Sequence, residues 1–185
     1  MPIASLILRV PFLAAALLAQ TTHSNPPAYS PILRFRDSPT GIQFTLPGDW
    51  KLIQRGPSSD SGEQIGFANK AFHADLFIWL KSQSVAQPDI TARLRSQIEF
   101  KATQRAGIPG YKMLQDTLQH RFVGGQPALS IAAEYEGNGA RMIEYQTFVI
   151  SERAQAYVSV RVPAPGFEKT KDAVDGILTS FIFPE

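Results

Sequence analysis

The sequence predicts an α+β fold in which an antiparallel β-sheet is flanked by helices. Three observations predict it. Residues 156–162 alternate apolar and polar side chains, which is typical of a half-buried strand. Residues 89–106 and 166–181 place apolar side chains three or four apart, which is the spacing of one helix face. A short loop, Gly137-Asn138-Gly139, separates two strand-like segments and favours a tight hairpin.

Length and composition indicate one globular domain. The chain has 185 residues, of which 44% are hydrophobic and 18% are charged. It contains no cysteine, which excludes disulfides, thiolate metal sites and cysteine nucleophiles. The core alone must therefore stabilise the domain.

The first 24 residues have the layout of a secretory signal. Arg9 precedes a short apolar run, Val10 to Ala19, and small polar residues follow up to Ser24. The run has ~10 residues, whereas a membrane span needs ~20. We expect a signal peptide at 1–24, a flexible leader at 25–33 and one domain at 34–185. Cleavage after Ala19 and a buried N-terminal helix are the alternatives.

Export would place the mature chain outside the cytoplasm, in the periplasm or the medium, with no stable membrane span. The chain has 18 Lys and Arg and 16 Asp and Glu, and the signal removes only Arg9, so the mature net charge is +1. The basic residues are scattered and form no stripe with interleaved aromatics. We therefore expect no nucleic-acid partner.

The first third of the domain is rich in strand patterns. Residues 42–46 alternate, the turn Pro47-Gly48-Asp49 follows, and extended patterns resume at 50–54 and 64–69. Residues 72–81 contain a continuous apolar run from Leu76 to Leu80. Such a run predicts a strand covered on both faces.

A helix is predicted next, over residues 89–106. Asp89 is a good N-cap, Gly107 ends the pattern, and Ile90, Leu94 and Ile98 fall on one face.

The second half predicts a meander of strands and a closing helix. The strands are expected at 120–123, 128–136, 141–150 and 156–162, and the helix at 166–181. Val158, Val160 and Val162 should face the core.

Three segments together resemble the PsbP-like family, which includes the photosystem II extrinsic protein and exported bacterial relatives. They are the opening Phe35 to Trp50, with its Asp, Gly, alternating strand, Pro and Trp; the turn Gly125 to Ala128; and the close Thr179 to Phe181. The resemblance covers residues 34–183. It implies a PsbP-like αβα sandwich and little about activity, since the relatives are binding or assembly factors that share no enzyme class. We expect no cofactor.

Candidate metal ligands are few. His73 and Asp75 lie two apart on a predicted strand and so share a face. A metal site needs three or four ligands, and His120 could be the third only if the fold brings it close. We expect a solvent-facing strand edge, with a metal site as the alternative.

Catalytic patterns are weak as well. No Gly-x-Ser-x-Gly motif is present. Glu134 and Glu136 share a strand face, and Glu144 is placed on the same face across the hairpin, but solvated outer-face charges explain such a set. We nominate no catalytic residue.

Aromatic residues are the remaining candidates. Seven of them could line a groove for a ligand: Trp50, Phe77, Trp79, Tyr111, Tyr135, Tyr145 and Tyr157. Trp79 and Phe77 suit core packing, whereas Trp50 and Tyr111 lie beside turns and are the candidates for ligand contact. The sequence thus favours an exported, non-catalytic binding or assembly module for a protein or a small apolar ligand. The alternative is a small extracytoplasmic hydrolase or a metal-dependent enzyme.

Overall fold

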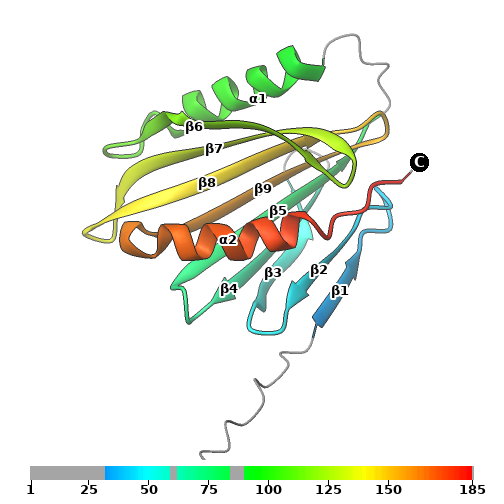
Figure 1. Ribbon diagram of the computed structural model, residues 1–185, viewed down its shortest axis with the longest axis horizontal. Helices are drawn as coiled ribbons and strands as arrows, with labels where there is room; N and C mark the ends of the chain where they lie inside the picture. The colour runs from blue at the N-terminus through cyan, green and yellow to red at the C-terminus, as the bar shows by residue number, and fades with distance from the viewer. Residues whose placement is uncertain (1–31, 59–61, 84–89, 185) are drawn as a thin grey trace, which may run out of the picture.

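The computed structural model describes residues 32–58, 62–83 and 90–184 (Figure 1). The predicted signal, most of the predicted leader and the proposed N-cap Asp89 lie outside these residues. The strands are β1 (Ile32–Arg36), β2 (Gln43–Pro47), β3 (Lys51–Pro57), β4 (Glu63–Asn69), β5 (Ala74–Ser82), β6 (Lys112–Val123), β7 (Gln126–Gly137), β8 (Ala140–Ile150) and β9 (Ala154–Pro163). The helices are α1 (Ile90–Arg105), a short 3-10 turn η1 (Ala164–Gly166) and α2 (Phe167–Leu178).

Seven strands form one antiparallel sheet in the order β3-β4-β5-β9-β8-β7-β6. The last strand, β9, therefore lies in the middle, between β5 and β8. Strands β1 and β2 form a separate hairpin, which is joined to the C-terminal segment through a bridge between Gln43 and Ile182. The predicted α+β fold with an antiparallel sheet is confirmed.

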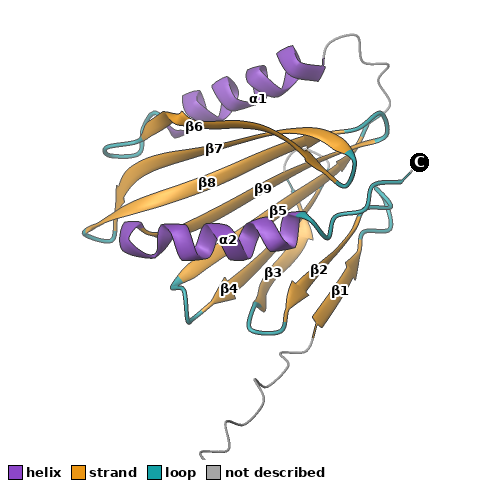
Figure 2. Ribbon diagram, viewed as in Figure 1, coloured by secondary structure: helices purple, strands orange, loops and turns teal. Residues whose placement is uncertain are grey.

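One face of the sheet is covered by α2 together with the β1–β2 hairpin (Figure 2). The larger hydrophobic core lies here. Val158, Val160 and Val162 pack in it, as their alternation predicts, because every second residue of β9 points to this face. Val174, Ile177 and Leu178 of α2 close the layer.

Helix α1 covers part of the opposite face. Leu94 and Ile98 are its buried residues, and they pack in a smaller core with residues of β7, β8 and β9. The helix contacts β7 and β8 at one end of the sheet. The structure is thus a helix–sheet–helix arrangement with unequal cover on its two faces.

The prediction that β5 is covered on both faces is right for one face only. Leu76, Ile78 and Leu80 are fully buried towards α2, whereas Phe77 and Trp79 on the α1 face are only partly buried. The cause is the position of α1, which packs on strands to one side of β5.

Two further boundaries differ from the sequence prediction. Strand β1 begins at Ile32, so the last two residues of the predicted leader belong to a strand. Strand β6 begins at Lys112, although its pattern predicts a strand only from His120. A register shift between Leu114 and Gln119 interrupts the alternation of apolar and polar residues along β6. The first part of the strand therefore lacks the sequence pattern by which a strand is predicted.

Both edge strands of the seven-stranded sheet are irregular. Besides the shift in β6, strand β3 has a register shift between Leu52 and Gln54. Leu52 and Ile53 are 51% and 54% exposed at this point.

Candidate functional site

The structure places Trp50 in the core. Its side chain is fully buried and its ring centroid lies 6.4 Å from that of Phe72. The turn that follows β2 directs it inward, and the Trp50 backbone N–H donates to the Pro47 carbonyl at 3.1 Å. Trp50 therefore offers no surface to a ligand.

The candidate metal ligands do not come together. His73 lies in the exposed turn before β5 with a φ of 51°, and Asp75 is exposed on β5. His120 is on edge strand β6, with three strands between it and β5. Among the described residues no group of three His, Cys, Asp or Glu side chains could hold a metal ion.

In the β7–β8 hairpin, Glu144 lies on the opposite face of the sheet from Glu134 and Glu136, which corrects the sequence interpretation that all three share one face. Glu144 pairs with Ala133, and Glu134 pairs with Ile143. Because neighbouring residues of a strand point to opposite faces, Glu134 lies on the α2 side and Glu144 on the α1 side. They cannot act as one carboxylate pair.

A groove of about 260 Å³ lies beside α1, over the part of the sheet that the helix leaves open. Its floor is aromatic. Trp79 of β5 and Tyr157 of β9 are direct Cα partners, and their ring centroids lie 4.9 Å apart. Phe148 of β8 extends the row at 4.6 Å from Tyr157, and Phe77 extends it at the other end at 5.7 Å from Trp79.

Phe77 can lie in this row because Gly66 is its partner on β4. A Cβ at position 66 would meet the Phe77 ring at 3.1 Å, which is closer than ordinary contact. The glycine thus leaves room for the aromatic side chain on the sheet surface.

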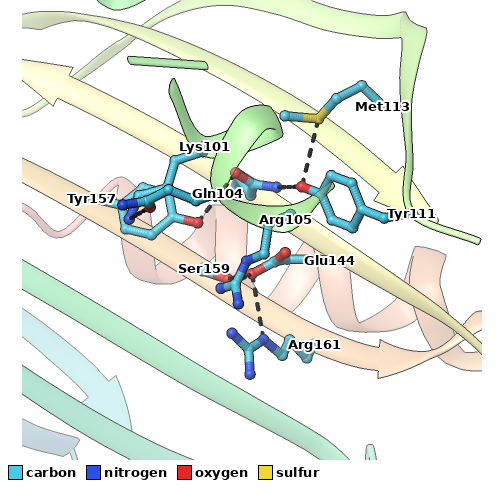
Figure 3. Close-up of polar contacts among 10 residues, drawn as sticks. Lys101, Gln104, Arg105, Tyr111, Met113, Glu144, Tyr157, Ser159 and Arg161 are labelled. Carbon is cyan, nitrogen blue, oxygen red and sulfur yellow. Dashed lines mark hydrogen bonds and ion pairs between the residues drawn. The ribbon is translucent and has the colours of Figure 1, made fainter. Parts of the chain in front are cut away.

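The wall and rim of the groove are polar. Gln97, Lys101 and Gln104 follow one another at helical spacing along α1 and face the groove, and Gln64 and Gln155 lie on its strand side. Lys101 Nζ lies 4.9 Å from the Tyr157 ring centroid and donates to Gln104 Oε1 at 3.1 Å (Figure 3). The helix therefore presents an amide-rich stripe to an aromatic floor.

A buried carboxylate beside the groove ties α1 to the sheet (Figure 3). Glu144 is 1% exposed, and its Oε1 accepts from three donors: Ser159 Oγ at 2.7 Å, Arg105 Nη2 at 3.2 Å and Arg161 Nε at 3.3 Å. Arg105 is in the last turn of α1. The Arg161 guanidinium also lies 5.3 Å from the Phe77 ring centroid, so the cluster adjoins the aromatic row.

Tyr111, the other candidate of the sequence analysis, belongs to a hydrogen-bonded chain next to this cluster. Gln146 donates to the Tyr111 hydroxyl at 2.8 Å and accepts from the Tyr157 hydroxyl at 3.1 Å. Burial, and then the charge of Glu144, raises the pKa of Tyr111 to about 12, and burial also raises the pKa of Tyr157. Tyr111 does not line the groove, and it contacts the floor only through Gln146, which bridges it to Tyr157.

The sequence analysis named Trp79 and Glu144 but favoured core packing for the first and a solvated outer face for the second, and it missed Gln146 and the polar residues of α1. Glu144 and Gln146 are polar residues on a strand whose remaining residues are mostly buried. Gln97, Lys101 and Gln104 repeat every three or four residues beside the apolar row of α1. Neither pattern identifies its partner, because the partners lie on β5 and β9.

A larger hollow of about 760 Å³ lies at the β7–β8 hairpin. Two of its charged residues pair with each other, since Arg141 Nε donates to Glu134 Oε2 at 2.9 Å. The hairpin residues that line it are mostly exposed. The groove beside α1 is the better built of the two.

No helix among the described residues is long and apolar enough to cross a membrane. The chain matches no family model and no characterised protein sequence.

Its fold is found in solved structures. CyanoP, the cyanobacterial PsbP of Synechocystis sp. PCC 6803, aligns with a TM-score of 0.63 over 86% of this chain and 96% of its own, at 11% identity. LpqN of Mycobacterium tuberculosis, involved in cell envelope biogenesis, aligns with a TM-score of 0.57 over 83% and 91%, at 17% identity.

A protein of Bacteroides thetaiotaomicron VPI-5482 aligns with a TM-score of 0.59 over 82% of this chain, at 11% identity. The aligned region covers 48% of that protein, so this chain spans about half of its length. At such identities these similarities establish a PsbP-like α+β fold and nothing of the activity.

Proposed function

We propose that the protein is a non-catalytic binding module that works outside the cytoplasm and holds a small ligand in the groove beside α1. The observation that carries the proposal is the groove itself, with its floor of Trp79 and Tyr157 and its polar wall on α1. Small-molecule sites commonly combine aromatic surface with a few placed polar groups.

The chemistry of the neighbouring residues supports binding over catalysis. Glu144, the buried carboxylate nearest the groove, already accepts from three donors, and two of them are cations. These contacts place Glu144 in an ion-pair network that holds α1, β8 and β9 together. Burial raises the pKa of Tyr111 and of Tyr157 further above neutral pH, so neither hydroxyl readily forms the phenolate that a base or nucleophile would need.

Two observations support a place outside the cytoplasm. The first 24 residues have the pattern of an export signal. LpqN, which shares the fold, is involved in cell envelope biogenesis. An assembly role in the envelope, with a protein or an apolar molecule as partner, is consistent with both.

Filling the groove tests the proposal. A fluorescent apolar probe, 8-anilinonaphthalene-1-sulfonate, should bind the mature protein with saturable enhancement. Gln97→Trp, on the groove side of α1, should abolish this saturable component because the indole would occupy the groove.

Ser96→Trp provides the matched control, since residue 96 is the exposed neighbour on the same helix. It should bind the probe as the unmodified protein does. Equal probe binding by all three proteins, with the helix intact by circular dichroism, would refute the groove as the site.

A further inference from the structure

We propose that the ligand of the groove is a saccharide. This inference rests on the proposed function and specifies its ligand. The floor and the rim each support it, through different features of a sugar ring.

The floor offers an aromatic surface of limited area, beside the Lys101 ammonium, whose Nζ lies 5.9 Å from the Trp79 ring centroid and 4.9 Å from that of Tyr157. Trp79 is partly buried on the face of β5 that α1 leaves open. Its ring centroid lies 5.7 Å from that of Phe77 and 4.9 Å from that of Tyr157, and these contacts hold the ring in place. The C–H face of a sugar ring is the apolar side of an otherwise hydroxylated molecule. A fixed aromatic ring matches that face without requiring deep burial of the ligand.

The rim is richer in amides than an apolar ligand requires. Four glutamine side chains line the groove: Gln64, Gln97, Gln104 and Gln155. Each amide provides two N–H donors and a carbonyl acceptor, and each sugar hydroxyl both donates and accepts. An apolar ligand would cover these amides without offering them hydrogen bonds, at a cost in affinity.

The charges of the lining point the same way. Lys81 and Lys101 line the groove, and none of the described residues that line it is an Asp or Glu. Lysine ammonium groups donate to hydroxyl oxygens, and they also attract the carboxylate of a uronic acid. A uronic-acid sugar should therefore bind more tightly than its neutral counterpart at low salt.

The two tryptophans of the chain make a direct test possible. In the ¹⁵N-labelled mature protein each gives one indole N–H signal, and Trp50→Phe identifies the buried one. Cellobiose, chitobiose and digalacturonic acid are added up to tens of millimolar. The Trp79 signal should shift and saturate with at least one of them, while the Trp50 signal stays in place.

Variants at the rim show whether the amides recognise the sugar. Gln104→Leu should weaken binding roughly two- to tenfold, which corresponds to the loss of one neutral hydrogen bond. Gln119→Leu, on the exposed surface of β6, should leave the affinity unchanged.

The result can be separated from the proposed function. If the fluorescent probe binds and Gln97→Trp abolishes it, but none of the sugars moves the Trp79 signal, the saccharide is refuted and the binding groove remains. If neither probe nor sugar binds, both proposals fail. Equal sugar-induced shifts of both indole signals would also refute the saccharide site.

Discussion

At the scale of single residues, Glu144 illustrates how position in the sheet decides what a side chain does. It and Glu134 come from neighbouring strands of one hairpin, yet Glu144 is 1% exposed between two arginines and Glu134 is 23% exposed in a surface pair with Arg141. A buried ion pair depends on both partners, because removing one leaves the other charge without compensation. A surface pair contributes little.

Glu144→Gln should therefore destabilise the protein by about 2–4 kcal/mol, because Arg105 and Arg161 lose their counter-charge. Glu134→Gln, the matched control, should cost about 0–1 kcal/mol. Urea unfolding of the three proteins measures both values. Similar costs for the two variants would contradict the structural role of Glu144.

The sequence could supply the identity of such residues but not their partners. Trp50 illustrates the same limit, since its place beside a turn suggested exposure and the structure buries it completely. Burial depends on what packs against a residue from distant segments, which a local pattern does not contain.

At the scale of elements, the two helices are held in different ways. Helix α2 buries Val174, Ile177 and Leu178 in the larger core. Helix α1 buries Leu94 and Ile98, packs Ile90 partly against the same core, and is further attached through the ion pair of Arg105 with Glu144. The wall of the groove thus depends on few apolar contacts.

Leu94→Ala should lower the free energy of unfolding by about 2–5 kcal/mol, through lost burial and the cavity left behind. Phe100→Ala, at a position that is 53% exposed on the same helix, should have little effect. Thermal or urea unfolding followed by circular dichroism distinguishes them. If Leu94→Ala left the free energy of unfolding unchanged, α1 would not pack on the sheet as described.

Helix α2 carries a carboxylate, Asp175, whose protonation in acid should lower the stability of the protein. Burial alone would raise the pKa of Asp175, but Arg121 and Lys171 hydrogen-bond to it and lower the pKa below the usual range. A carboxyl whose pKa is lower in the folded state stabilises the protein above the pKa of the unfolded chain, about 3.9, and that stability is lost as the pH falls through the folded value.

The free energy of unfolding should therefore fall as the pH drops below about 4, and Asp175→Asn should flatten that part of the profile. Urea midpoints measured from pH 2 to pH 6 provide the test. An unchanged acid limb in the variant would assign the acid sensitivity to other carboxylates.

At the scale of the whole molecule, the fold was the part that the sequence could predict. Two patterns can be recognised from the local sequence alone. They are the alternation of a strand, as in Val158, Val160 and Val162, and the spacing of a helix face, as in Leu94 and Ile98. The order of strands is not local. The placement of β9 beside β5 creates the contact of Trp79 with Tyr157, so the groove could not be read from the chain before that pairing was known.

Export is the prediction that belongs to the whole chain. Intact-mass analysis of the protein recovered from outside the cytoplasm should place its N-terminus near residue 20 or residue 25, as expected for signal cleavage. A soluble product that retains Met1 would contradict the signal peptide and the location proposed with it.

The irregular edges of the seven-stranded sheet bear on how the protein behaves at high concentration. A regular edge strand offers a row of unpaired backbone groups onto which another chain can add, and this is how sheets grow into aggregates. Here the register shift after Leu52 interrupts that row on one edge, and the shift after Leu114 interrupts it on the other. The exposed Leu52 and Ile53 lie on such an interrupted edge. Their apolar side chains are therefore not accompanied by a continuous row of unpaired backbone groups onto which another strand could add.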